Sequence, residues 1–148
     1  MGAALSPGRR ILLVDDHPAV SQRIRELLAE GIPGLEVVAV GTGEQGIAIA
    51  QVEPFDLVLL DLRLPGRGGI EILKELRVMR PGLPIIIISS LPESPYATLV
   101  RRAGAQGFIT KSALGEELER VVRLYVSARP VPLTDGSAPA QREDRFGE

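Results

Sequence analysis

Five short runs of β-branched residues and leucine alternate along the chain with five longer segments of helical spacing, and this alternation limits the possible folds most. The runs that predict strands are residues 10–14, 35–40, 55–60, 83–88 and 107–110. The segments that predict helices are residues 18–30, 43–52, 69–79, 94–103 and 114–127. Strands that alternate with helices in this way favour one parallel sheet with helices wound over both of its faces.

The positions of the apolar residues support both assignments. In the first helical segment, apolar side chains recur at Val20, Ile24 and Leu27, on one face of a helix. The third and fourth strands contain the runs DLVLL and PIIII, which is typical of strands covered on both faces. In an open parallel sheet, ligands bind beyond the carboxyl ends of the strands, so the functional residues are expected there.

The length of 148 residues suits one domain with a substantial core. Residues 1–8 are predicted to form a flexible tail, and residues 9–128 the folded domain. Residues 129–148 contain prolines and no apolar periodicity, which predicts a disordered tail or linker.

The composition argues against several classes of function. A formal net charge of −2 gives no electrostatic basis for binding nucleic acid. The absence of cysteine excludes disulfides and zinc thiolate sites. The apolar runs are too short to cross a bilayer, and the first residues lack the hydrophobic segment of a signal peptide. We therefore expect a cytoplasmic protein without a membrane partner.

Polar residues stand at the ends of four predicted strands. Asp15 and Asp16 follow the first strand, Asp61 the third, Ser89 the fourth, and Lys111 the fifth. If these strands are neighbours, three carboxylates, a hydroxyl and an ammonium meet at one edge. Two carboxylates about 4 Å apart repel by roughly 4 kcal/mol at an effective dielectric of about 20, so a Mg²⁺ ion is the natural complement. One carboxylate could then act as a nucleophile and form an acyl phosphate.

Each of these residues also has a purely structural interpretation. The Asp15–Asp16 pair could form a turn or a helix cap, and Asp61 could begin the turn that follows it. Lys111 could be an ordinary solvated lysine at a helix start. His17 is interpreted as opening the first helix beside Pro18. The coincidence of the polar residues at four strand ends favours the phosphoryl-accepting site.

At this point the sequence resembles the receiver domain of two-component response regulators. The matching stretches are ILLVDDHPAV, DLVLLDLRLPGRGGIEIL, PIIIISS and RRAGAQGFITKS, and together they span roughly residues 10–126. The residues in these stretches are most similar to those of the branch that usually carries a helix-turn-helix output domain. The resemblance implies a flavodoxin-like (βα)₅ fold with strand order 2-1-3-4-5. It leaves open whether the chain is a stand-alone receiver or one excised from a DNA-binding parent.

The resemblance also implies roles for the polar residues. Asp61 would accept a phosphoryl group from a phosphohistidine on a sensor histidine kinase or phosphotransfer protein, and Lys111 would pair with that group. Asp15, Asp16, Asp61 and the backbone carbonyl of Arg63 would bind Mg²⁺. The protein would not be an enzyme beyond Mg²⁺-dependent self-phosphorylation and autodephosphorylation.

The resemblance further implies a switch. Ser89 would swing to the phosphoryl group, and Phe108 occupies the position of the aromatic switch residue, although a lone aromatic in an inner strand is otherwise a core residue. The face of helix 4, strand 5 and helix 5 would change and could form a homodimer. Two residues depart from the family pattern: Gly68 stands where an aspartate is common, and Ser112 replaces a proline.

Three alternative functions are weighed against this one. Residues 41–46 read GTGEQG, which matches the dinucleotide-binding pattern G-x-G-x-x-G. This motif lies in the second strand–helix unit rather than the first and leaves Asp15, Asp16 and Lys111 unexplained. An aspartyl-phosphate phosphatase would place a second aspartate where Arg63 stands. A receiver fold that docks without phosphorylation remains the third alternative.

Overall fold

The computed structural model describes residues 9–126, and it consists of one five-stranded sheet and five α-helices. The strands are β1 Arg10–Val14, β2 Glu36–Val40, β3 Leu57–Asp61, β4 Ile85–Ser89 and β5 Gly107–Thr110. The helices are α1 Pro18–Gly31, α2 Gly43–Val52, α3 Gly69–Met79, α4 Glu93–Arg102 and α5 Leu114–Val126, with the 3-10 turn η1 Lys111–Ala113 before α5. The predicted tails 1–8 and 129–148, and residues 127–128 of the predicted domain, lie outside the described residues.

All four strand pairs are parallel, and the strand order is β2-β1-β3-β4-β5. The predicted doubly wound α/β fold and its 2-1-3-4-5 order are therefore confirmed. The order reverses between β1 and β3, and such a switch point opens a crevice beyond the carboxyl ends of the strands. The edge expected to hold the functional residues is thus the edge at this switch point.

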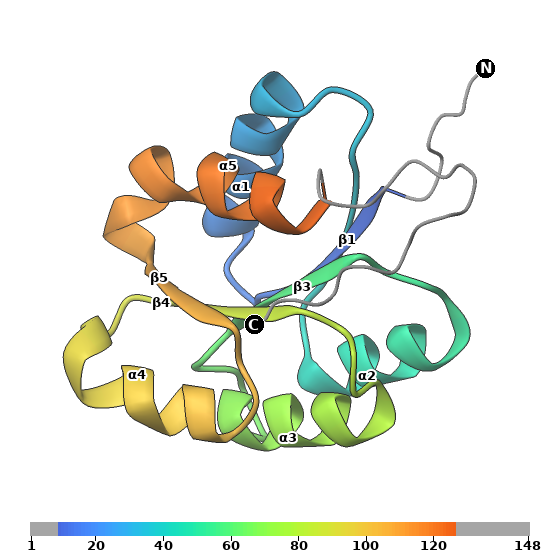
Figure 1. Ribbon diagram of the computed structural model, residues 1–148, viewed down its shortest axis with the longest axis vertical. Coiled ribbons are helices and arrows are strands. Elements are labelled where there is room, and N and C mark those ends of the chain that lie inside the picture. Colours follow the sequence, from blue (N-terminus) through green and yellow to red (C-terminus); the bar gives the residue numbers. More distant parts are fainter. Residues whose placement is uncertain (1–8, 127–148) are drawn as a thin grey trace, which may run out of the picture.

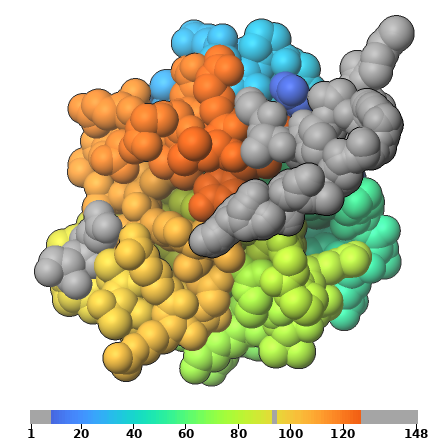
Figure 2. Space-filling view, in the orientation of Figure 1, coloured from blue at the N-terminus to red at the C-terminus, as the bar shows by residue number. Residues whose placement is uncertain are grey.

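The helices form two layers, with α1 and α5 on one face of the sheet and α2, α3 and α4 on the other (Figure 1). In Figure 2, the orange of α5 lies beside the blue of α1 across the upper part of this side of the molecule. Successive residues of β3 serve the two layers in turn, because side chains alternate across a strand. Leu57 and Leu59 pack in the core beneath α1 and α5, whereas Val58 and Leu60 pack in the core beneath α2, α3 and α4. Both layers therefore require apolar residues, which explains the continuous apolar runs.

The two inner strands β3 and β4 begin later than predicted, at Leu57 and Ile85 rather than at residues 55 and 83. The residue before β3 makes a side-chain contact: the Asp56 carboxylate accepts a hydrogen bond from the backbone N–H of Arg10 at 2.8 Å. Pro84 has no N–H to donate to a ladder, although its carbonyl accepts a hydrogen bond from Val58 N at 2.9 Å. These contacts explain why each strand begins after its apolar sequence begins.

The glycine-rich stretch before α2 is explained by helix capping and close packing. The Thr42 hydroxyl accepts a hydrogen bond from Gln45 N at 3.1 Å, and the Gln45 side chain bonds back to Thr42 N at 3.2 Å. This reciprocal pair is a capping box. A Cβ on Gly46 would come within 2.8 Å of Val14 Cγ2, so a side chain there would push α2 away from β1. The GTGEQG motif thus has a structural role in positioning α2.

Within residues 9–126, none of the helices has both the length and the apolar character needed to span a membrane.

Candidate functional site

Two buried aspartates lie side by side at the carboxyl end of the sheet. The register of β1 against β3 pairs Val14 with Leu60, which places Asp15 next to Asp61. Asp15 is 4% exposed and Asp61 is 1% exposed, whereas the neighbouring Asp16 is exposed. The sheet topology therefore brings the predicted carboxylates together.

Lys111 joins these aspartates from the turn after β5. Its Nζ lies 3.2 Å from Asp61 Oδ2 and 3.4 Å from Asp15 Oδ2. Only 14% of the lysine side chain is exposed, so its charge is directed at the carboxylates rather than at solvent. Lys111 therefore meets the carboxylates at the edge of the sheet where its position after the fifth strand places it.

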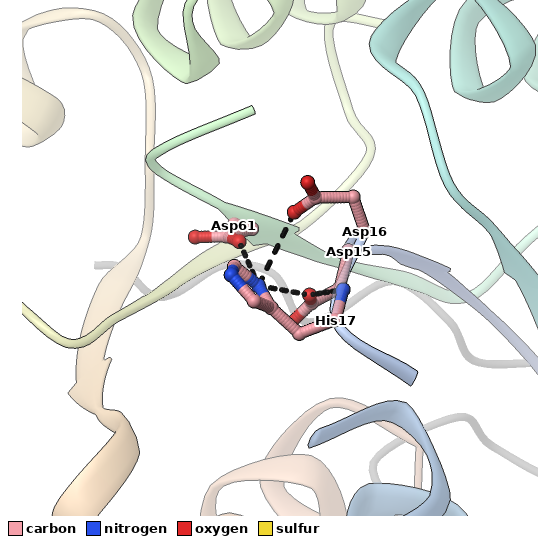
Figure 3. Close-up of side chains that lie close together, drawn as sticks. All are labelled: Asp15, Asp16, His17 and Asp61. Atoms are coloured by element: carbon pink, nitrogen blue, oxygen red, sulfur yellow. Dashed lines mark hydrogen bonds and ion pairs between the residues drawn. The ribbon is translucent and has the colours of Figure 1, made fainter. Parts of the chain in front are cut away.

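The imidazole of His17 lies among the three carboxylates, as Figure 3 shows. Its Nδ1 is 3.0 Å from Asp15 Oδ1, 3.2 Å from Asp16 Oδ1 and 3.4 Å from Asp61 Oδ2. The interpretation of His17 as a helix-opening residue covers only part of its role: it is the N-cap of α1, but its side chain points into the acidic cluster rather than capping the helix. The signal that could have revealed this is its position immediately after two aspartates.

The acidic cluster carries more negative than positive charge. Burial raises the pKa of Asp61, and the nearby Asp15 carboxylate raises it further, although the Arg63 N–H and the Lys111 ammonium oppose both effects. Among residues 9–126, Asp15 Oδ2 is the one buried side-chain polar atom without a hydrogen bond, and its contact is the ion pair with Lys111 Nζ at 3.4 Å. Buried carboxylate oxygens are costly without a compensating cation or donor.

The donor atoms fit a divalent cation. One ligand atom from each of Asp15, Asp16, His17 and Asp61 lies within 4.8 Å of all the others. Carboxylate oxygens are the ligands that Mg²⁺ prefers. A cation at this position would balance the excess negative charge, because Lys111 is a single positive charge beside three carboxylates.

The cluster opens into a cleft of about 460 Å³. The cleft is lined by residues from the ends of β1, β3, β4 and β5: Asp16, His17, Asp61, Arg63, Leu64, Ser90 and Lys111. It is large enough to admit a phosphoryl-sized group next to Asp61, with polar side chains around it.

The remaining predicted residues are placed around this cleft. Arg63 lines it, and its backbone N–H donates to Asp61 Oδ1 at 3.1 Å, which fixes the carboxylate. Ser89 is fully buried, and its Oγ accepts from Leu91 N at 3.0 Å rather than contacting the carboxylates. Phe108 is 7% exposed and packs in the core beneath α2, α3 and α4. The structure therefore brings the acidic residues and Lys111 together and holds Ser89 and Phe108 apart from them.

Comparison with known proteins identifies the family of the chain. The profile of the response regulator receiver domain matches residues 11–123. The chain belongs to the response regulator receiver domain family. This receiver domain is 36% identical over 115 residues to the response regulator GacA of Pseudomonas aeruginosa, an alignment that covers 77% of this chain and 53% of GacA. It therefore spans about half the length of that relative.

Two solved structures are similar to the receiver domain. A two-component response regulator of the LuxR family from Aurantimonas is 36% identical with a TM-score of 0.73, over 81% of this chain and 86% of that one. The response regulator TrrA from Thermotoga maritima, solved in complex with Mg²⁺ and BeF, is 31% identical with a TM-score of 0.70. That match covers 79% of this chain and 98% of TrrA.

Proposed function

We propose that this receiver domain is a phosphorylation-dependent signalling switch whose phosphoacceptor is Asp61. The observation that carries the proposal is that Asp61 is buried at the end of β3, faces the cleft, and lies 3.2 Å from Lys111 Nζ. The phosphoryl donor is a phosphohistidine on a histidine kinase or phosphotransfer protein. An Asp61 carboxylate oxygen attacks phosphorus, a P–O bond forms, the P–N bond breaks, and its electron pair returns to the donor imidazole.

The residues of the site have different roles in this transfer. The Arg63 N–H holds one Asp61 oxygen, so the carboxylate is oriented before the donor arrives. Lys111 offsets the negative charge of the incoming phosphoryl oxygens. Because charge spreads over these oxygens in the transition state, positioning and electrostatic stabilisation supply most of the rate enhancement.

Mg²⁺ is the cofactor that the donor set fits. We propose that Asp15, Asp16, Asp61 and the backbone carbonyl of Arg63 hold it. When bound, the ion supplies positive charge that screens the carboxylates from the phosphoryl group. The close spacing of the acidic ligand atoms and the magnesium complex of TrrA support this assignment.

The switch begins at Ser89. Its Oγ currently accepts from Leu91 N, so it must release the first residues of the β4–α4 loop before it can turn to a phosphoryl group on Asp61. This links modification of Asp61 to α4, which packs against β5, the strand of Phe108. We propose that the face formed by α4, β5 and α5 changes in response, and that it serves a partner or a homodimer. The only reactions of the domain itself are Mg²⁺-dependent self-phosphorylation and autodephosphorylation.

The test is labelling of the protein with acetyl phosphate and Mg²⁺, followed by intact-mass spectrometry. Wild type should gain one phosphoryl group, and Asp61→Asn should gain none. Asp56→Asn is a matched control, because Asp56 is also buried but precedes β3 at the opposite end of the strand. Labelling of Asp61→Asn would contradict the proposal. No labelling of wild type, with partner binding retained, would favour the phosphorylation-independent docking module.

A further inference from the structure

His17 Nδ1 has more close polar neighbours than a single ring nitrogen can serve. Besides the three carboxylate oxygens, Lys111 Nζ lies 3.2 Å from it. In one tautomer Nδ1 carries a proton and can donate to one oxygen; in the other it has a lone pair and can accept from Lys111. In either tautomer, several of the neighbouring polar atoms make no hydrogen bond to Nδ1. A cation placed among the nitrogen and the three oxygens would coordinate all four of these atoms at once, while the Lys111 ammonium keeps the Asp15 and Asp61 oxygens as its partners.

The spacing of the donor atoms supports a cation at this point. Ligands about 2.1 Å from a metal lie about 3.0 Å apart along the edge of an octahedron and about 3.4 Å apart in a tetrahedron. The distances from His17 Nδ1 to Asp15, Asp16 and Asp61 are 3.0, 3.2 and 3.4 Å. Each of these distances is one that two ligands of a common cation would have.

The backbone holds His17 in this position. Its own N–H donates to Asp15 Oδ1 at 2.7 Å. The following Pro18 keeps the His17 backbone extended, with φ −105° and ψ 104°. The backbone that carries the imidazole is therefore held beside the carboxylates by contacts within the chain.

We propose that His17 Nδ1 is a direct ligand of the divalent cation, and that it shifts the selectivity of the site from Mg²⁺ toward imidazole-preferring ions such as Co²⁺. The inference rests on the proposed cation site and adds a nitrogen to its oxygen ligands. Imidazole suits first-row transition metals, whereas Mg²⁺ takes oxygen ligands and water. The site would then bind either class of ion, with His17 as the residue that sets the balance.

The composition makes a direct test possible, since the chain has one histidine and no cysteine. Tag-free protein loaded with Mn²⁺ should show the ¹⁴N coupling of one imidazole by pulsed electron paramagnetic resonance. That coupling must vanish in His17→Asn, a residue that also suits the N-cap of α1. His17→Ala serves as a second variant, because it provides neither a nitrogen nor an oxygen.

The second readout is the ratio of Co²⁺ to Mg²⁺ affinity by titration calorimetry. Replacing His17 should lower this ratio by at least about tenfold, the order of loss typical when a metal site is disturbed. Glu30→Gln, an exposed residue at the far end of α1, should leave the ratio at the wild-type value. Asp61→Asn should weaken binding of both ions, because it removes a shared oxygen ligand.

The outcomes separate the two proposals. Absence of imidazole coupling together with an unchanged ratio in both His17 variants would overturn the role of His17, even if wild type is phosphorylated normally. Failure of wild type to bind Mg²⁺ or to be phosphorylated would instead overturn the proposed function. Circular dichroism of each variant confirms that the comparison is made between folded proteins.

Discussion

Lys111 Nζ lies 3.2 Å from Asp61 Oδ2, although 50 positions separate the two residues in the sequence. The contact joins the end of β3 to the turn after β5, across the intervening strand β4. It also places a positive charge in the cleft next to the proposed phosphoacceptor. The ammonium thus serves both the resting site, where it offsets buried carboxylates, and the phosphorylated site, where it faces the phosphoryl oxygens.

Lys111→Ala should slow phosphorylation by acetyl phosphate by about tenfold or more, because a charge-assisted contact contributes roughly 1.5–3 kcal/mol. The fold should persist, since Lys111 belongs to neither hydrophobic core. The measurement is the rate of labelling in Mg²⁺ by intact-mass spectrometry. Lys74→Ala, at an exposed position of α3, is the matched control and should label at the wild-type rate. Equal rates for both variants would contradict the role of Lys111.

Asp61→Asn should stabilise the metal-free protein at neutral pH. Burial, reinforced by Asp15, raises the pKa of Asp61 in the folded state above its value in the unfolded chain. The favourable effect of proton binding is therefore present below the unfolded pKa of about 4 and is lost as the pH rises through the folded pKa. Asparagine does not ionise, so the variant avoids this loss, and we expect a gain on the order of 1–2 kcal/mol.

The measurement is urea unfolding in EDTA at several pH values between about 4.5 and 7.5. The difference between variant and wild type should narrow as the pH falls. Added Mg²⁺ should stabilise wild type more than the variant, since binding to the folded state alone raises stability. A variant that is less stable than wild type at neutral pH in EDTA would disprove the electrostatic argument.

The sequence was sufficient to predict the layers of the fold because each inner strand has to serve two cores. Leu59 and Leu60 are consecutive apolar residues that pack on opposite faces of the sheet. The ends of the strands were harder to predict, because they depend on partners far away in sequence. The Arg10 N–H that binds Asp56, for example, comes from a residue 46 positions earlier.

The candidate site was predictable to a similar extent. Asp15, Asp61 and Lys111 could be placed together, because parallel strands end at the same edge of a sheet. The position of the His17 ring could not be predicted from the sequence, because it depends on a side-chain rotamer and on the turn between β1 and α1. Ser89 was correctly placed at the end of β4, but only the structure shows that its hydroxyl accepts a hydrogen bond from Leu91 N.

Ser89→Ala should allow phosphorylation but uncouple it from the response of α4. The variant loses the Oγ contact to Leu91 N, so it lacks the link between the site and the β4–α4 loop. Loss of this buried hydrogen bond should also cost about 1 kcal/mol of stability. Amide chemical shifts of α4 and β5 on adding Mg²⁺ and beryllofluoride report the response. Ser90→Ala removes a hydroxyl that lines the cleft but makes no hydrogen bond to Leu91 N, so it should keep the shifts that Ser89→Ala abolishes.

Gly43→Ala should destabilise the protein, which tests the structural interpretation of the glycine-rich stretch. A Cβ at this position would overlap Cγ1 and Cδ1 of Ile72, a fully buried side chain of α3. Overpacking of this kind typically costs about 1–3 kcal/mol. Gly41→Ala is the matched control, because a Cβ there meets no other atom within 4 Å, and its stability should stay close to wild type. Thermal unfolding of the two variants gives the comparison.

The same proteins address the dinucleotide alternative. If Gly43 packs helices rather than approaching a pyrophosphate, wild type should show no saturable change in NADH fluorescence at micromolar concentrations. A saturable change in wild type, lost in a folded Gly43→Ala protein, would show that the motif binds a dinucleotide. Destabilisation by Gly43→Ala without NADH binding would instead locate the requirement for glycine at the contact between α2 and α3, where Ile72 leaves no space for a side chain.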